Sequence, residues 1–293
     1  MIIITGSAGF VGKALYSSLA SADLIGDAPT VVGYDKKIGV DLAEDQPLHA
    51  LLFDLDPHCI VHLASSVSTL GSIRKPEQTF RDTVMTTVNV MKYAAMHQTP
   101  VILTSSVKAR DGKTPYGAAK VMAETWAMEM AEAFDIPLVI NRPGTIYGPG
   151  QEGSEESGWV SWFLQAKAES RKVFISGNGE QTRDLLHVDD YVRLLRLQID
   201  DIRRKQIASS GSAADLLHRE FPTYDFRVGA NPPSIWDVGG GKSNEISVKA
   251  FAEFLGLEYS LGPARYGDAW RYVGKNRVPG WEPKIRWDDG RLG

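Results

Sequence analysis

The chain begins with MIIITGSAGFVG (residues 1–12), in which a run of isoleucines passes directly into the pattern Gly-x-x-Gly-x-x-Gly. The apolar run predicts a buried strand over 2–5, and the following residues have the apolar spacing of a helix over 13–21. Glycines between a strand and a helix let the backbone approach a pyrophosphate, toward which the helix directs its free N–H groups. We therefore predict a dinucleotide site at Gly6, Gly9 and Gly12.

An acidic residue follows the second predicted strand, which covers residues 30–34. Asp35 lies 23 residues after Gly12, where a carboxylate accepts hydrogen bonds from ribose hydroxyls and repels a 2′-phosphate. This position favours NAD as the cofactor. Lys36 and Lys37 come directly afterwards, and either ammonium could neutralise a phosphate, so the sequence leaves NADP open as the alternative.

Short β-branched runs alternate with helical patterns through the first half of the chain. Strands are predicted over 2–5, 30–34, 59–63, 101–104 and 137–141, and helices over 13–21, 79–97 and 116–134. This alternation indicates an α/β fold, a Rossmann-type doubly wound parallel sheet with helices on both faces.

The second half of the chain does not continue this alternation. Residues 144–160 are rich in glycine and acidic side chains, and the later predicted elements are scattered. We expect residues 1–143 to form an NAD-binding domain to which segments 184–200 and 234–240 return, and residues 144–293 to form mainly a smaller carboxyl-terminal substrate lobe, with a cleft between the two. The stretch 208–214, rich in serine and alanine, predicts a surface insertion.

A tyrosine and a lysine stand four residues apart in the predicted helix over 116–134. This spacing places Tyr116 and Lys120 on one face, about one turn apart. A neighbouring cation favours the ionised form of a phenol, so the pair could supply a base near neutral pH. A surface tyrosine beside a solvated lysine is the plain alternative for this pattern alone.

Composition excludes several classes of function. A net charge of −4 gives no electrostatic footprint for nucleic acid, and no stretch reaches the roughly 20 apolar residues of a membrane span. Cys59 lies in an apolar run and predicts a buried thiol without a disulfide, which suits a reducing cytoplasm. The six histidines lack the spacing of a ligand cluster, so we predict no metal site. We expect a soluble, unprocessed, cytoplasmic protein.

Further motifs accompany these features along nearly the whole chain. They are Tyr-Gly-Pro-Gly at 147–150, Gly-Asn-Gly-Glu-Gln-Thr-Arg-Asp at 177–184, Val-Asp-Asp at 188–190, Val-Gly-Gly-Gly at 238–241 and Gly-Trp-Glu-Pro at 280–283. With the amino-terminal glycines, Ser106, Tyr116 and Lys120, the chain resembles the extended short-chain dehydrogenase/reductases, and among them the nucleotide-sugar epimerases and dehydratases. The run Gly-Trp-Val-Ser-Trp-Phe at 158–163 and Lys108 resemble most closely the branch that epimerises CDP-linked dideoxysugars at C2.

The resemblance implies a set of cofactor residues. The glycine turn would hold the pyrophosphate, Asp35 the adenosine ribose, and Lys120 the nicotinamide ribose. The complete set implied is Gly6, Gly9, Phe10, Val11, Gly12, Asp35, Asp41, Leu42, Leu63, Ala64, Tyr116, Lys120 and Pro143.

The resemblance also implies the groups that act on the substrate. Tyr116 would be the catalytic base and acid, and Ser106 its hydrogen-bonding partner on the sugar. Arg183 and Arg265 match arginines that grip the diphosphate of a sugar nucleotide, and a guanidinium fork suits such contacts. Ion pairs of these arginines with acidic neighbours such as Asp268 are the alternative. The remaining implied substrate residue is Thr145, where related epimerases often carry asparagine or cysteine.

The chain departs from the family pattern in one loop. Only nine residues separate Ser106 from Tyr116, where the family usually has some twenty that line the sugar pocket. Val107 and Lys108 follow the serine, so the acidic pair with which dehydratases remove a hydroxyl is missing. The sequence therefore disfavours dehydration and leaves the identity of the sugar open.

Together these features predict an NAD-dependent epimerase of a nucleotide-diphosphate sugar, which acts through a transient keto-sugar. The alternatives are an NAD(P)-dependent reductase or dehydrogenase of the same fold, and a dinucleotide-binding protein without chemistry. Trp126, Met130 and Phe134 recur every four residues and predict an apolar stripe that by default faces the core. Because the family often pairs this helix with its copy in a second subunit, we also expect a homodimer.

Overall fold

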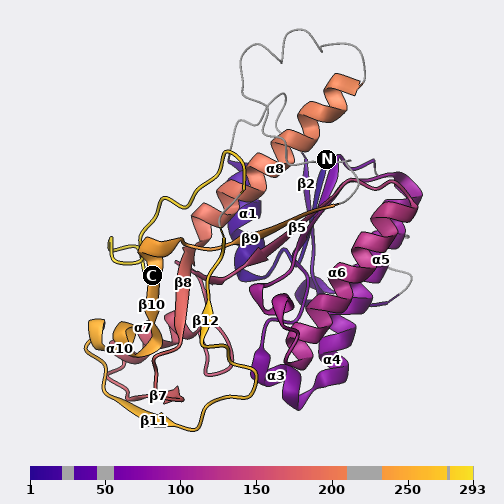
Figure 1. The fold of residues 1–293 in the computed structure, drawn as a ribbon. Helices are drawn as coiled ribbons and strands as arrows, with labels where there is room; N and C mark the ends of the chain where they lie inside the picture. The colour runs from indigo at the N-terminus through magenta and orange to yellow at the C-terminus, as the bar shows by residue number, and fades with distance from the viewer. Residues whose placement is uncertain (22–29, 45–55, 210–232, 276–277, 293) are drawn as a thin grey trace.

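A six-stranded parallel sheet forms the centre of the computed structural model, with the strand order β2-β1-β3-β4-β5-β9 (Figure 1). The structure describes residues 1–21, 30–44, 56–209, 233–275 and 278–292. The strands are β1 (Ile2–Thr5), β2 (Val31–Tyr34), β3 (Cys59–His62), β4 (Val101–Thr104), β5 (Leu138–Pro143) and β9 (Ser234–Val238). The order reverses direction between β1 and β3, so the prediction of a doubly wound Rossmann-type sheet is confirmed.

Alternate residues of the strands face the two sides of the sheet. Ile2 and Ile4 of β1 pack on one side against α1 (Phe10–Ala20) and α8 (Val188–Ser209). Ile3 packs on the other side with α5 (Thr86–His97) and α6 (Pro115–Ala133). Helices cover both faces (Figure 1), so the central strands are continuous apolar runs, as expected for a buried parallel sheet.

The helix predicted over 79–97 differs from the observed structure. The chain forms α3 (Thr69–Arg74) and α4 (Pro76–Phe80), then a π-helical turn, η2 (Arg81–Met85), and only then α5. Threonine hydroxyls bond backbone carbonyls around this turn, since Thr86 Oγ1 donates to the Asp82 carbonyl at 3.0 Å and Thr87 Oγ1 to the Thr83 carbonyl at 2.8 Å. Such bonds compete with the regular helical ladder and accompany local changes of pitch.

The apolar stripe predicted on α6 is only partly in the core. Met130 packs beneath the helix with the residues of α5, as expected. Trp126 is 44% exposed and Phe134 48% exposed, so the prediction of a core position is wrong for these two residues. Their spacing of four or eight residues is that of a helix face, but nothing in the described part of the chain covers that face.

A smaller set of strands lies at the carboxyl edge of the central sheet. There β8 (Thr182–His187) pairs with β6 (Thr145–Tyr147), β10 (Glu245–Ser247) and β12 (Arg271–Tyr272), and β7 (Val173–Ser176) pairs with β11 (Tyr259–Gly262). The helices α7 (Trp159–Ala168) and α10 (Val248–Phe254) pack with them around Phe163 and Phe251. Three short 3-10 turns complete the described elements: η1 (Lys36–Ile38), η3 (Val107–Arg110) and η4 (Lys242–Asn244).

Two later segments of the chain lie on the central sheet. Helix α8 starts directly after β8 and packs against α1, and β9 pairs in parallel with β5. From residue 210 on, the insertion predicted over 208–214 lies outside the described residues. Cys59 is fully buried, as predicted. No helix of the described chain is both long and apolar enough to cross a membrane.

A reciprocal amide pair fastens α8 to the sheet. Asn141 Nδ2 donates to Gln198 Oε1 at 2.8 Å, Gln198 Nε2 donates to Asn141 Oδ1 at 2.9 Å, and both side chains are fully buried. Each amide therefore satisfies groups that would otherwise be orphaned inside the core.

We predict that Gln198→Leu lowers the free energy of unfolding by about 2 kcal/mol, because it leaves the Asn141 amide buried without its partner. Chemical denaturation measures this loss. Gln165→Leu, at an exposed glutamine, is the matched control and should change stability by less than about 0.5 kcal/mol. The double variant with Asn141→Leu should be less damaging than the sum of the two single changes, and strict additivity would contradict the pairing.

Candidate cofactor and substrate site

A cavity of about 1070 Å³ opens where the central strands end at their carboxyl side. The structure brings every residue implied by the sequence to its wall, although these residues come from positions throughout the chain. They are Gly6, Gly9, Phe10, Val11, Gly12, Asp35, Asp41, Leu42, Leu63, Ala64, Ser106, Tyr116, Lys120, Pro143, Thr145, Arg183 and Arg265.

The glycine turn between β1 and α1 leaves no room for side chains. Gly6 has φ +72°, and a Cβ there would lie 2.7 Å from the backbone nitrogen of Ala64. A Cβ on Gly12 would lie 2.1 Å from the Gly6 carbonyl oxygen. Gly9 caps α1 without a side-chain hydrogen bond, so the first N–H groups of the helix remain available to a ligand. The cradle fits the pyrophosphate of a dinucleotide.

Asp35 supports this turn as well as facing the cavity. Its Oδ2 accepts a hydrogen bond from the backbone N–H of Ala8 at 3.1 Å, and its Oδ1 accepts one from the N–H of Lys37 at 2.8 Å. The carboxylate is therefore held in place beside the glycine turn. Carboxylate oxygens can accept more than one bond each, so the group retains the capacity to bind a ribose hydroxyl.

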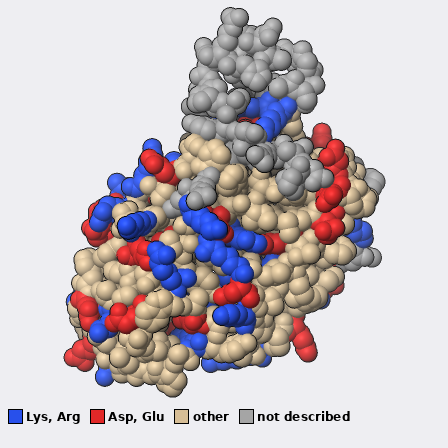
Figure 2. Space-filling model, viewed as in Figure 1, with Lys and Arg blue, Asp and Glu red and all other residues tan. Residues whose placement is uncertain are grey.

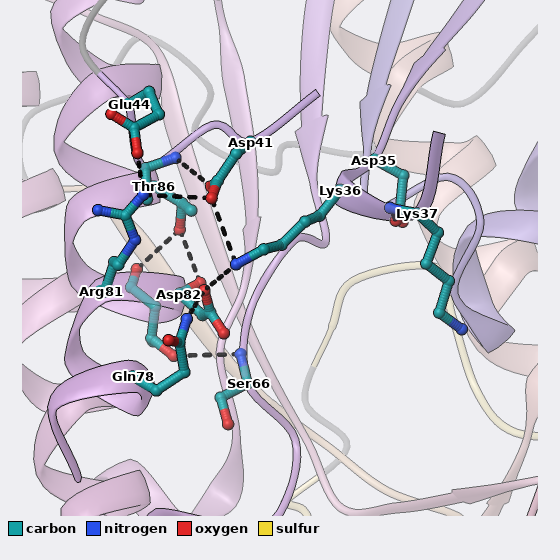
Figure 3. A network of polar contacts seen from close by, with 12 residues as sticks. Asp35, Lys36, Lys37, Asp41, Glu44, Ser66, Gln78, Arg81, Asp82 and Thr86 are labelled. Atoms are coloured by element: carbon teal, nitrogen blue, oxygen red, sulfur yellow. Dashed lines mark hydrogen bonds and ion pairs between the residues drawn. The ribbon is translucent and has the colours of Figure 1, made fainter. Parts of the chain in front are cut away.

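A network of charges near this end of the cavity engages Lys36 (Figure 3). The Lys36 ammonium lies 3.2 Å from Asp41 Oδ2 and 3.4 Å from Asp82 Oδ1. Arg81 pairs with both Asp41 and Glu44, and the Asp41 pKa is lowered by its hydrogen bonds with Ala43, Arg81 and Lys36, against the effect of burial. Lys36 is therefore occupied by carboxylates, and only a ligand that competes with them could recruit it.

Lys37 differs from Lys36 in its surroundings. Figure 3 shows its side chain directed away from the network, and no ion pair joins it to another described residue. The sequence leaves NADP open because of Lys36 and Lys37. In the structure Lys36 is paired with carboxylates, whereas Lys37 is not paired with any described residue.

Helix α6 presents the tyrosine and lysine to the cavity from its first turns. Thr114 caps the helix, because its Oγ1 accepts the N–H of Gly117 at 3.1 Å, and Pro115 occupies the first helical position. The Lys120 ammonium lies 6.0 Å from the centroid of the Tyr116 ring. The two side chains are thus adjacent on one face, as their spacing predicts.

Lys120 is a buried ammonium with specific acceptors. It is 3% exposed, and its Nζ donates to Ser65 Oγ at 2.9 Å and to the Thr104 carbonyl at 3.1 Å. Burial lowers the pKa of Lys120 to about 8, while Glu124, one turn further along α6, raises it. The side chain therefore still carries a proton at neutral pH.

Burial also governs the phenol. It raises the pKa of Tyr116, and a hydrogen bond with Ser106 partly opposes this effect. The sequence suggests that Lys120 makes Tyr116 a base near neutral pH, but in the chain by itself the cost of burying a phenolate is the larger effect. The phenol is therefore neutral until further positive charge enters the site.

The short segment between Ser106 and Tyr116 is covered by the carboxyl-terminal part of the chain. Arg110 Nη2 donates to the Val273 carbonyl at 2.9 Å, and the Tyr272 hydroxyl donates to Asp111 Oδ2 at 3.1 Å. Gly267 packs so closely on Thr114 that a Cβ would lie 2.2 Å from the threonine methyl. Residues 267–273 therefore form the wall beside the shortened loop.

Arg183 and Arg265 reach the cavity from this second set of strands and loops. Arg183 is buried, and its guanidinium donates to Asp268 at 2.5 Å and to the carbonyls of Thr182 and Ala269. The ion pair expected as the alternative for Arg183 thus exists, although the residue also lines the cavity. Arg265 has no ion pair with any described residue, so its charge is available to an anion.

Sequence reasoning did not identify Ser65, Arg81 or Asp82. Ser65 follows β3 at the carboxyl edge of the sheet, where parallel strands usually place functional groups, so this general rule could have found it. Arg81 and Asp82 lie in the π-helical turn η2, and no local pattern indicates that they contact the loop after β2.

Comparison with known proteins gives one family match and more distant relatives. The model of the NAD dependent epimerase/dehydratase family matches residues 2–209. The UDP-glucose 4-epimerase of Mycolicibacterium smegmatis is 28% identical over 225 residues, which are 65% of this chain and 70% of the relative. The CDP-paratose 2-epimerase of Salmonella typhi is 26% identical over 245 residues, which are 66% of this chain and 72% of the relative.

A solved structure shares the fold over nearly the full length. The UDP-glucose 4-epimerase of Thermus thermophilus in complex with NAD superposes with a TM-score of 0.75, at 20% identity, and covers 99% of this chain and 96% of that one. At this identity the likeness concerns the fold.

We predict that two carboxylates discriminate against NADP, Asp35 directly and Asp82 by holding Lys36. Asp35→Ala should raise NADP affinity about tenfold, since a repulsion worth about 1.4 kcal/mol is removed. Adding Asp82→Ala should give about a further twofold, because Lys36 then keeps its ion pair with Asp41. Dissociation constants for NAD and NADP from isothermal titration measure both steps.

A third variant serves as the control for this prediction. Lys36→Met in the double-variant background should cancel the second gain and leave the first. If Asp82→Ala improves NADP binding equally with or without Lys36, the lysine is not the group released.

Proposed function

The chain belongs to the NAD-dependent epimerase/dehydratase family, and we propose that within it the protein is an epimerase of a nucleotide-diphosphate sugar. Its cofactor is NAD, as Asp35 at the end of β2 predicts. The family consists of enzymes that act on nucleotide sugars, so the proposal concerns which reaction this member carries out.

The observation that carries the proposal is the placement of Ser106, Tyr116 and Lys120 on the wall of the cavity that also contains the glycine turn. Cofactor cradle and acid–base groups therefore share one space. The Tyr116 oxygen can take the proton of a sugar hydroxyl as that carbon is oxidised and return it when the carbon is reduced. Ser106 can hold the same hydroxyl by a hydrogen bond.

Residues of the chain hold the cofactor and tune the phenol. The glycine turn would bind the pyrophosphate, and Asp35 and Lys120 would bind the two riboses. Bound NAD supplies a reversible acceptor for the hydrogen and electron pair of a sugar carbon, and a positive charge that favours the phenolate. With the Lys120 ammonium, whose pKa is about 8, this charge opposes the effect of burial on the pKa of Tyr116.

Epimerisation follows if the keto-sugar turns in the cavity before it is reduced on its other face. No net oxidation or reduction occurs, and the cofactor stays bound between turnovers. A reductase of the same fold would instead consume reduced cofactor. Val107 and Lys108 stand where dehydratases carry an acidic pair, which speaks against dehydration.

We further propose that one part of the chain binds the cofactor and another part mainly binds the substrate. Residues 1–143, with 184–200 and 234–240, would bind NAD, because β9 and α8 lie on the same sheet as the glycine turn. Residues 144–293 would mainly bind the substrate and contribute Thr145, Arg183 and Arg265 to the cavity.

We also propose that the protein is a homodimer. Apolar side chains are exposed on three helices that pack together, α4, α5 and α6, where Met96 is 64% and Met122 42% exposed. Figure 2 shows few charged groups over α4 and the end of α6 next to it, with a row of acidic groups above them at the upper right. The described chain does not cover this face, and a second copy would bury it along with Phe80, Val121 and Trp126.

We predict that Tyr116→Phe lowers turnover by about 10²–10⁴-fold, the usual contribution of a positioned acid–base group. NAD affinity should stay within about threefold, since the phenyl ring is retained. Turnover is followed by nuclear magnetic resonance with UDP-, CDP- and dTDP-linked sugars, and mass spectrometry of small molecules released from the denatured protein guides the choice.

Tyr147→Phe is the control for this experiment, because Tyr147 is also buried but is not among the cavity-lining residues. The Tyr147→Phe variant should have the same turnover rate as the natural protein. A Tyr116→Phe variant of near-normal rate would overturn the assignment. Net change in absorbance at the reduced-nicotinamide band during turnover would identify a reductase instead.

We predict that Trp126→Glu converts the dimer to a monomer, because a buried carboxylate would lack a partner in the interface. Light scattering after size exclusion measures the mass. Phe254→Glu, at an exposed aromatic of α10 outside the proposed interface, should leave the dimer intact. A natural protein that is monomeric at micromolar concentration contradicts the proposal.

A further inference from the structure

Lys108 is a cation of the cavity wall that the reaction described above does not use. It lies in η3, two residues after Ser106, and its side chain is half-buried against the cavity. Among the described residues no ion pair or hydrogen bond engages its ammonium. The ammonium lies over the face of the Tyr272 ring, with Nζ 5.3 Å from the centroid.

The carboxylates that face Lys108 already have other partners. Asp268 pairs with Arg183, and Asp111 accepts the hydroxyl of Tyr272. Burial lowers the pKa of Lys108, and Arg183 and Arg265 lower it further, against the opposing effect of Asp268 and Asp111. The positive charge of this ammonium is not compensated by the carboxylates around it, and an anionic group of a ligand would stabilise it.

The backbone of Lys108 lies beside the residues of the proposed reaction, and its ammonium faces the Tyr272 ring, whose centroid is also 5.0 Å from the Arg183 guanidinium. The Lys108 N–H donates to Ser106 Oγ at 3.3 Å, and its carbonyl oxygen lies against Gly117, where a Cβ would be 2.9 Å away. The Lys108 backbone therefore contacts Ser106 and the residue after Tyr116. Ser106 and Tyr116 are the serine and the tyrosine that would hold the reacting hydroxyl. Arg183 and Arg265 come from β8 and from the segment after β11, in the other part of the chain.

We propose that Lys108 binds a carboxylate carried by the sugar, so that the substrate is a nucleotide-diphosphate uronic acid or a similar acidic sugar rather than the dideoxysugar expected from the resemblance that Lys108 helps to carry. This inference rests on the proposed function, since it assigns the substrate class of the same site. The arginines of the other part of the chain would hold the diphosphate, and Lys108 would hold the anionic substituent of the ring. A lysine suits this role as a compact point charge on a flexible stem.

The test compares two ligands that differ only at one carbon of the sugar. UDP, CDP and dTDP are first titrated into the NAD-loaded protein to find the base that binds. The glucose and glucuronic acid derivatives of that diphosphate are then titrated into the natural protein, Lys108→Met and Lys37→Met. Lys37 also lines the cavity, but at the cofactor end, so it controls for loss of any cavity lysine.

The natural protein should bind the glucuronic acid derivative at least about tenfold more tightly than the glucose derivative, a difference of about 1.4 kcal/mol. Lys108→Met should remove this preference and leave the glucose derivative and the free diphosphate within about twofold. Lys37→Met should keep the preference. Unchanged NAD affinity and melting temperature of Lys108→Met show that the variant is folded.

Three results would overturn the proposal in distinguishable ways. Equal affinity of the natural protein for both sugars excludes a carboxylate site while the nucleotide-sugar function stands. Weakening of all ligands alike by Lys108→Met, the free diphosphate included, assigns the lysine to the diphosphate. Failure of every nucleoside diphosphate to bind contradicts the proposed function itself, and this inference with it.

Discussion

The buried ammonium of Lys120 is the interaction on which the fold and the site both depend. A charge taken out of water is costly unless its donors are satisfied, and the acceptors of Lys120 among the described residues are Ser65, after β3, and the Thr104 carbonyl, at the end of β4. Helix α6 must therefore dock with its first turns over the carboxyl edge of the sheet. The same docking brings Tyr116, one turn earlier, to the cavity wall, so the contact that makes the burial tolerable also positions the phenol.

Charges around the cavity fall into two groups with different consequences. Lys36 and Arg183 are held by carboxylates and stabilise the walls, in the loop after β2 and in the segment before β12. Lys108 and Arg265 have no such partner within the described residues and face the same cavity. Paired charges stabilise the walls of the site, and the charges without a carboxylate partner, beside Arg183, favour a ligand that carries anionic groups.

Local sequence was a good guide where one element determines its own structure. The strands, the glycine turn and the face shared by Tyr116 and Lys120 follow from periodicity and from the special freedom of glycine. The helix predicted over 79–97 failed because threonine hydroxyls bond the carbonyls around η2, and the core position of Trp126 failed because periodicity identifies an apolar face without saying what covers it. The wall beside the shortened loop was unpredictable for a related reason, since residues 267–273 reach it from more than 150 positions away.

The sequence by itself determined the parallel α/β fold, the family and the NAD cofactor, together with many of the residues that line the cavity. Tertiary structure decided which of those residues form ion pairs. Lys36 pairs with Asp41 and with Asp82 of η2, Arg183 pairs with Asp268, and Lys108 pairs with no described residue. The physical reason is the range of the forces involved. Propensity, periodicity and turn chemistry act within about ten residues of chain, whereas an ion pair depends on which distant segments the packed sheet and helices bring within about 4 Å of each other.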